Sequence, residues 1–95
     1  MKANAQIRML THEEGGRVGP ISSGYLATVA IADILTAARL RLISDDTAVP
    51  GGTYSVELTF GNPEYVGTRL RVDTPIALNE GLRRVATGVI TEVAS

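Results

Sequence analysis

The sequence Tyr-Ser-Val-Glu-Leu-Thr-Phe at residues 54–60 decides the fold. Its large apolar side chains stand at every second position, and Ser, Glu and Thr stand between them. Because successive side chains of a β-strand point to opposite faces, this alternation predicts a strand with one buried and one exposed face. The segment is therefore typical of a sheet that covers a core on one side only.

Five further segments are predicted to be strands. In Arg39–Ile43 and Arg69–Asp73, arginines alternate with aliphatic residues, so the charged side chains would point outward. Ala5–Thr11, Tyr25–Ala32 and Val85–Val93 are rich in β-branched residues and are bounded by turn residues. We predict an all-β chain folded as a closed six-stranded antiparallel β-barrel, because closure removes the sheet edges on which strands aggregate.

The segment Ile31–Leu40 fits two interpretations. Its apolar residues recur with the i, i+3, i+4, i+7 spacing of a helix face. The competing interpretation ends the second strand near Ala32 and treats Asp33–Ala38 as an irregular loop that leads into the next strand.

The length and the charge of the chain limit its function. Ninety-five residues suit a single domain, 1–95, and nine Lys and Arg against ten Asp and Glu give a net charge of −1. This balance lacks the attraction that drives binding to nucleic acids or anionic membranes. The chain has no cysteine, no signal peptide and no apolar run of membrane-spanning length. We therefore expect a cytoplasmic protein that does not bind membranes.

Four motifs carry a resemblance to a known family. A Glu-Gly-Gly-Arg turn occupies Glu14–Arg17, a Gly-Tyr pair follows at residues 24–25, a Pro-Gly turn stands at residues 50–51, and Glu80–Ile90 closes the chain. Their order and spacing, over roughly residues 3–94, resemble the C-terminal (third) β-barrel domain of translation elongation factor Tu. The resemblance implies a barrel of that type and favours the irregular loop over the helix at residues 33–38.

The chain also departs from that family. After Gly-Tyr the family has Arg-Pro-Gln, and here the Gln position is occupied by Thr28. The segment Asp73–Asn79 is longer than the family's hairpin, which predicts a remodelled loop. In the family the aligned Gln and the Glu at the position of Glu80 contact tRNA, and only Glu80 is kept. The resemblance therefore leaves RNA binding as an alternative rather than the first expectation.

The chain offers no combination of residues typical of an enzyme. His12 is the only histidine, so a Ser-His-Asp triad with Ser22 or Ser23 is not expected. The three adjacent residues 12–14 do not make a metal site by themselves. Gly15 and Gly16 lack the remainder of a phosphate-binding loop and are better explained by a turn with positive φ. We expect no enzyme activity, no cofactor, no metal and no GTP binding.

The predicted function is a non-enzymatic binding module, a stand-alone barrel that binds a protein partner or self-associates. In the family, neighbouring domains cover much of this barrel, so a solitary copy must either carry a polar surface or offer the uncovered part to a partner. The alternatives are a translation-associated RNA-binding or tRNA-binding accessory factor, and a decoy or protective mimic of elongation factor Tu. Arg17 and Arg83 also have a structural interpretation, in which arginine forks tie loop carbonyls or carboxylates together. The predicted interaction surface comprises Arg17, Tyr25, Thr28, Ile76, Leu78, Glu80, Arg83 and Arg84.

Overall fold

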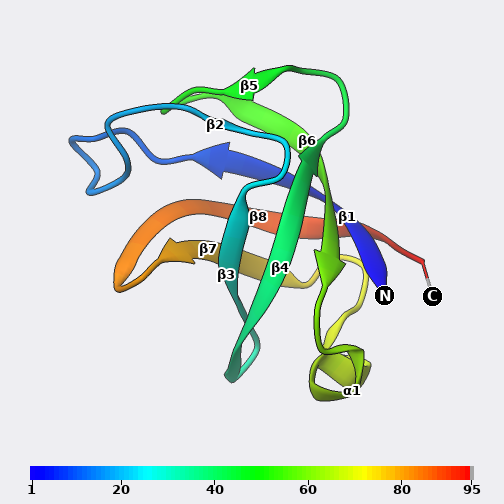
Figure 1. The fold of residues 1–95 in the computed structure, drawn as a ribbon. Coiled ribbons are helices and arrows are strands. Elements are labelled where there is room, and N and C mark those ends of the chain that lie inside the picture. The colour runs from blue at the N-terminus through cyan, green and yellow to red at the C-terminus, as the bar shows by residue number, and fades with distance from the viewer. Residues whose placement is uncertain (95) are drawn as a thin grey trace.

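Six strands close into an antiparallel barrel in the computed structural model, which describes residues 1–94 (Figure 1). The strand order is β1-β6-β4-β3-β7-β8, and β8 pairs with β1 to close the ring. The prediction of a closed six-stranded antiparallel barrel is confirmed. The barrel strands are β1 (Lys2–Met9), β3 (Leu26–Ile31), β4 (Ile34–Leu42), β6 (Thr53–Phe60), β7 (Pro75–Glu80) and β8 (Arg83–Ala94).

Alternation along each strand sends one set of side chains into the barrel. In β4, buried and exposed residues alternate without interruption over Ile34–Leu42. The interior contains aliphatic side chains from all six barrel strands, which pack into one cluster. Those that are large and fully buried include Ile7, Met9, Ile31, Leu40, Leu58, Leu78 and Ile90.

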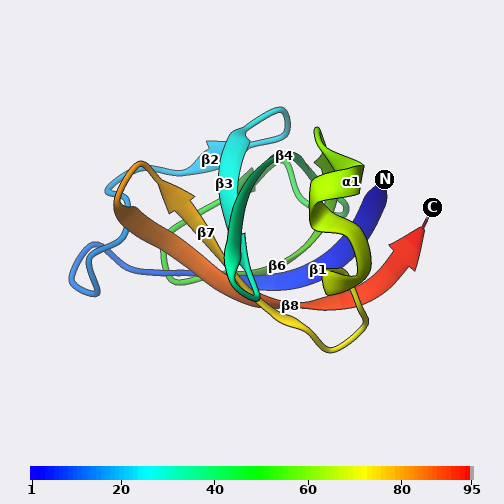
Figure 2. The same cartoon turned by 90° about the horizontal axis from the view of Figure 1, so that it is seen from below.

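Short elements cover the two ends of the barrel. At one end, β2 (Ile21–Ser22) pairs with β5 (Thr47–Ala48) in a two-stranded sheet. At the other end lie the helix α1 (Pro63–Val66) and the 3-10 turn η1 (Gly67–Arg69), in the foreground of Figure 2. Val66 from this end is fully buried in the core cluster. The barrel is therefore closed to solvent by its own connecting segments.

The predicted strand Arg69–Asp73 is wrong, and so is the predicted loop Asp73–Asn79. Arg69 ends η1, and Asp73 has a φ of 71° in the turn that follows. Only Leu70 of this stretch is buried. The alternation of arginine and aliphatic residues in the sequence therefore does not correspond to a strand with one buried face. The fifth barrel strand is β7 instead, which pairs with β3 on one side and β8 on the other.

Residues 31–40 form neither a helix nor an irregular loop. β3 and β4 are joined by a two-residue turn at Ala32 and Asp33, and Ile31 pairs directly with Ile34. Ala32 takes a φ of 51°, as a tight hairpin turn of this kind requires. Leu35 is apolar although it points outward, and this produces the helix-like spacing in the sequence.

The Glu-Gly-Gly-Arg turn follows β1, and its two glycines have different roles. Gly15 has a φ of 94°, which favours glycine, as the sequence predicted. At Gly16 a Cβ atom would lie 2.5 Å from the Leu10 carbonyl oxygen, so only glycine fits this close approach. The turn is further held by Glu14, whose carboxylate accepts hydrogen bonds from the Thr11 backbone N–H and from the Arg8 guanidinium.

Candidate interaction surface

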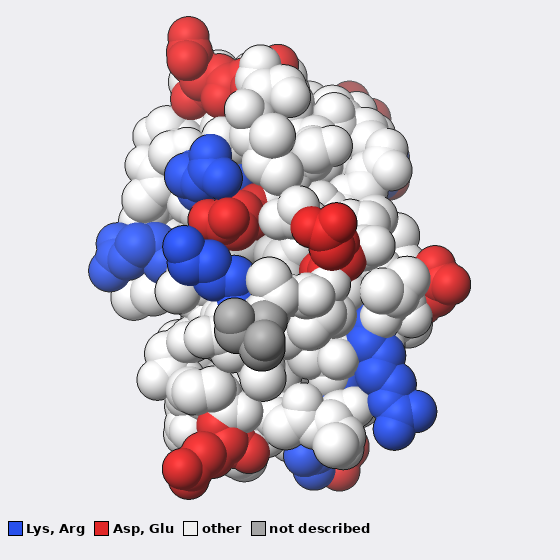
Figure 3. Space-filling model, turned by 90° about the vertical axis from the view of Figure 1, so that its right-hand side faces the viewer, with Lys and Arg blue, Asp and Glu red and all other residues white. Residues whose placement is uncertain are grey.

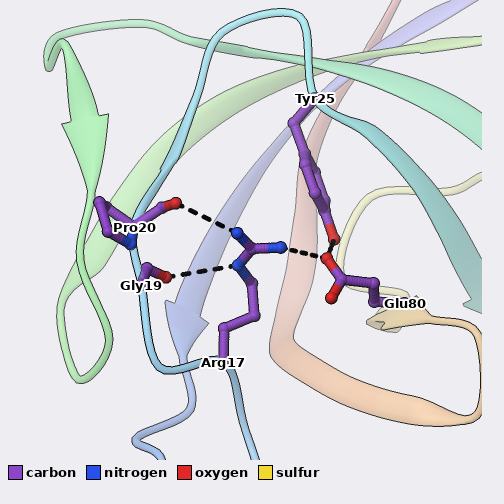
Figure 4. A network of polar contacts seen from close by, with 5 residues as sticks. All are labelled: Arg17, Gly19, Pro20, Tyr25 and Glu80. Carbon is purple, nitrogen blue, oxygen red and sulfur yellow. Dashed lines mark hydrogen bonds and ion pairs between the residues drawn. The ribbon is translucent and has the colours of Figure 1, made fainter.

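Three of the predicted surface residues meet at the end of the barrel where β3 begins and β7 ends (Figure 4). Arg17 forms an ion pair with the Glu80 carboxylate. The Tyr25 hydroxyl donates a hydrogen bond of 2.7 Å to the same carboxylate oxygen. The Arg17 guanidinium also lies 5.5 Å from the centre of the Tyr25 ring, within the range of a cation–π contact. Arg17 lies in the loop after β1, Tyr25 directly precedes β3, and Glu80 ends β7, so the cluster joins three separate segments.

The cluster fixes the protonation states of its two acidic groups. The hydrogen bond from Tyr25 and the charge of Arg17 hold the pKa of the Glu80 carboxyl below its usual value. Burial, together with the hydrogen bond to Glu80, raises the pKa of Tyr25 to about 12. Near neutral pH, Glu80 is therefore ionised and Tyr25 is a neutral donor, which is the state that this geometry needs.

Arg17 joins the loop to the barrel. Its Nε donates to the Gly19 carbonyl at 3.3 Å, and its Nη2 donates to the Pro20 carbonyl at 3.4 Å. With its Nη1 on Glu80, the guanidinium bridges two loop carbonyls and a carboxylate on β7. The structural interpretation of Arg17 is therefore correct. Arg83 makes no comparable hydrogen bond or ion pair within residues 1–94.

An outward face with few charges lies beside this cluster. Strand register places Leu35, Ala30 and Ala77 in one cross-strand row over β4, β3 and β7. Ala37 and Thr28 stand in the next row, opposite Asn79. Leu26 and Leu35 are 61% and 59% exposed, although neither is needed to fill the interior. We call this surface the β3–β4–β7 face and define it by Leu26, Thr28, Ala30, Leu35, Ala37 and Ala77. Ala77 belongs to it by strand register, although its neighbours leave only 6% of its surface exposed.

Two shallow hollows mark the β3–β4–β7 face. The first has a volume of about 300 Å³ and is lined by Leu26, Ala37 and Arg39, together with Thr59 of β6 and Gly61. The second has a volume of about 440 Å³, and its lining includes Ala30, Ala77 and Arg84. Small side chains form the floors of both hollows, so a partner's side chains can approach the sheet closely.

Figure 3 shows the side of the barrel near the start of β1. Basic and acidic side chains both occur there, and neither sign covers the view as one continuous patch. Lys2 on β1 and Arg41 on β4 each lie within ion-pair distance of Glu57 on β6, at 3.9 and 3.3 Å. Phosphate backbones bind best where basic groups gather, and on this side acidic side chains lie among the basic ones.

The structure separates the predicted surface residues into four groups. Arg17, Tyr25 and Glu80 form the cluster, and Thr28 lies on the β3–β4–β7 face with Arg84 beside it. The prediction that Ile76 and Leu78 belong to an exposed surface is wrong. Both lie on β7 and are buried, with 5% and 0% of their surfaces exposed. Arg83 is exposed in the β7–β8 hairpin, opposite Glu80.

Sequence reasoning missed Ala30, Leu35 and Ala37, three of the six residues that define the face. Ala30 and Ala37 are small, and small apolar residues in a strand do not by themselves signal a surface. The available signal was an outward position without a polar residue, which becomes visible only when the strand register is known. Arg39 was expected on the outer face, and it is exposed there, where it also lines the first hollow.

Within residues 1–94, no group of three or more His, Asp or Glu side chains is placed to hold a metal ion. None of the helices described there is long and apolar enough to cross a membrane. His12 is exposed in the turn after β1. A comparison with models of known protein families finds no match for this chain.

Proposed function

We propose that the protein is a non-enzymatic binding module that holds a protein partner on its β3–β4–β7 face. The observation that carries this proposal is the exposure of Leu26 and Leu35 beside two hollows with apolar floors. An exposed apolar surface bounded by polar residues is a common feature of protein interaction sites. Leu26 and Leu35 are not needed to fill the barrel interior. Contact with a partner, rather than the stability of the fold, therefore explains why apolar residues stand at these two positions.

The proposal includes a relation to the third domain of elongation factor Tu. What supports the relation is the position of the shared motifs on the barrel. The Glu-Gly-Gly-Arg turn follows β1, the Gly-Tyr pair precedes β3, and Glu80–Ile90 spans the end of β7 and most of β8. The Arg17–Glu80 ion pair links the first and the last of these motifs. From this relation to a translation factor we also propose a cytoplasmic location.

A photo-cross-linking experiment tests the proposal. A photoreactive amino acid is introduced at Ala37, which is exposed on the face, and in a matched variant at Gln6, which is exposed on β1. Each variant of the full chain is irradiated in an extract of the source cells. We expect cross-linked protein species from the Ala37 position that are absent from the Gln6 position. Equal labelling from both positions, or none from Ala37, would overturn the proposal.

A ribonuclease step separates the protein partner from RNA. If the cross-linked species at Ala37 survives ribonuclease and disappears with protease, the partner is a protein. If ribonuclease removes it, the RNA-binding alternative replaces the proposal, and its affinity should then fall steeply with salt concentration.

A further inference from the structure

Each hollow of the β3–β4–β7 face combines an apolar floor with a single basic side chain. Arg39 lines the first hollow and Arg84 lines the second. Neither lining contains an Asp or a Glu. By contrast, the hollow beside β2 is lined mostly by polar residues, and there Arg41 shares the lining with Asp45 and Asp46. An arginine without an acidic residue in the same lining is therefore a property of this face and not of every hollow in the barrel.

The two arginines retain most of their hydrogen-bonding capacity. Nη1 of Arg39 donates to the Gly24 carbonyl at 2.9 Å, which holds the guanidinium beside the hollow. Four of its five N–H donors then remain for a partner. Arg84 makes no ion pair with any residue in 1–94. An arginine fork of this kind binds a carboxylate in a bidentate geometry, so the face is complementary to acidic groups.

Two other modes of binding do not fit this face. All six barrel strands are paired on both sides, so within residues 1–94 this face offers no open strand edge to which a partner could add a strand. A second copy related by a two-fold axis would bring the same surface against itself. That arrangement would place the arginines of both copies in one interface without a carboxylate between them, which is unfavourable.

We propose that the partner contributes an acidic segment with two aliphatic side chains, each next to an Asp or a Glu. One aliphatic side chain enters each hollow, and the neighbouring carboxylates bind to Arg39 and Arg84. This inference rests on the proposed function, because it names the chemistry of the partner for the same face.

Selection from a random peptide library displayed on phage tests this chemistry before the partner itself is identified. The full chain is immobilised, and peptides that also bind the Ala37→Gln variant, in which a longer side chain would occupy the first hollow, are discarded. We expect the retained peptides to be enriched in Asp and Glu beside Leu, Ile or Val. A synthetic consensus peptide is then titrated against the wild type, Arg39→Glu, Arg84→Glu and the control Arg71→Glu, an exposed arginine that lines neither hollow.

Charge reversal at either hollow should weaken the Kd of the peptide about fivefold to tenfold, whereas Arg71→Glu should leave it unchanged. Exchange of the peptide's carboxylates for lysines should restore binding to the Arg39→Glu, Arg84→Glu double variant. Retained peptides that are neutral or basic, or that bind all four proteins equally, would overturn the acidic partner. The cross-linking result at Ala37 would then still decide the proposed function by itself.

Sedimentation of the wild-type chain over a concentration series tests a second copy as the occupant. We expect a monomer throughout. Association that disappears in the Asp45→Asn, Asp46→Asn variant would overturn the inference, because the exposed acidic loop of a neighbouring copy would then occupy the face.

Discussion

Two outer surfaces of the same barrel differ in the polarity of their outward side chains. On β1, the outward positions are Lys2, Asn4, Gln6 and Arg8, all polar, and they alternate with buried apolar residues. On the β3–β4–β7 face, the outward positions are mostly Ala and Leu. The interior is apolar beneath both, so the requirement for a core does not explain the difference. An outer position needs only to tolerate water, and apolar residues gathered at such positions indicate a contact with another molecule.

The largest expected effect is a difference in stability between substitutions at an inner and an outer position of β4. Leu40 and Leu35 both lie on β4, but Leu40 is fully buried, whereas Leu35 is mostly exposed. Leu40→Ala should lower the free energy of unfolding by about 2–5 kcal/mol because it leaves a cavity. Leu35→Ala should change it by no more than about 0.5 kcal/mol. Urea unfolding of both variants provides the measurement. A large loss for Leu35→Ala would mean that the face supports the fold, and the comparison would fail.

The same difference explains which strands could be read from the sequence. β6 was predicted almost to its ends, because its outward positions are polar and the alternation is visible. β7 and the first half of β4 were missed, because apolar residues stand on both sides of these strands. Ile76, Ala77 and Leu78 form an unbroken apolar run, and a register shift after Leu78 interrupts the alternation further. The apolar outward positions of the face therefore hid β7 and the first half of β4 from sequence analysis, whereas β3 was predicted as Tyr25–Ala32.

The second largest effect is expected where β8 pairs with β1, the strand that carries the polar outer surface. Gly88 lies opposite Ile7, and a Cβ atom there would lie 2.4 Å from the backbone oxygen of Gln6. Gly88→Ala should therefore lower the free energy of unfolding by about 1–3 kcal/mol. Gly61→Ala is the matched control, because nothing lies within 4 Å of its added Cβ atom. Thermal unfolding of the two variants should show a lower Tm for Gly88→Ala alone.

The cluster of Arg17, Tyr25 and Glu80 could be predicted from sequence motifs only in part. The sequence motifs placed all three residues at the surface and gave Arg17 a structural role. They did not predict that Tyr25 and Arg17 share one carboxylate, because that contact depends on how a long loop returns to the end of β7. Contacts between segments so distant in the chain depend on the barrel register, and no local pattern encodes it.

A smaller effect is expected from this cluster, and it depends on pH. The pKa of Glu80 is lowered by folding, so its contribution to stability is present above the unfolded value of 4.5 and is lost as the pH falls through the folded value. Glu80→Gln should lower the free energy of unfolding by less than about 1 kcal/mol at pH 7, because both side chains of the pair remain partly exposed to water. The difference from the wild type should shrink as the pH falls below 4.5. Urea unfolding over a pH series measures it, and a difference that persists at low pH would assign the loss to packing rather than charge.

The smallest effect on stability should coincide with a clear change in surface chemistry. Leu26→Lys combined with Leu35→Lys replaces two exposed leucines of the β3–β4–β7 face, so the free energy of unfolding should change by no more than about 0.5 kcal/mol. The matched control is Gln6→Lys with Ser55→Lys, an exposed cross-strand pair on β1 and β6. On a hydrophobic-interaction column, the face variant should elute earlier than the wild type, and the control should elute with it. Equal shifts for both variants would show that the two surfaces do not differ in apolar character, because the added charge alone would then account for the change in retention.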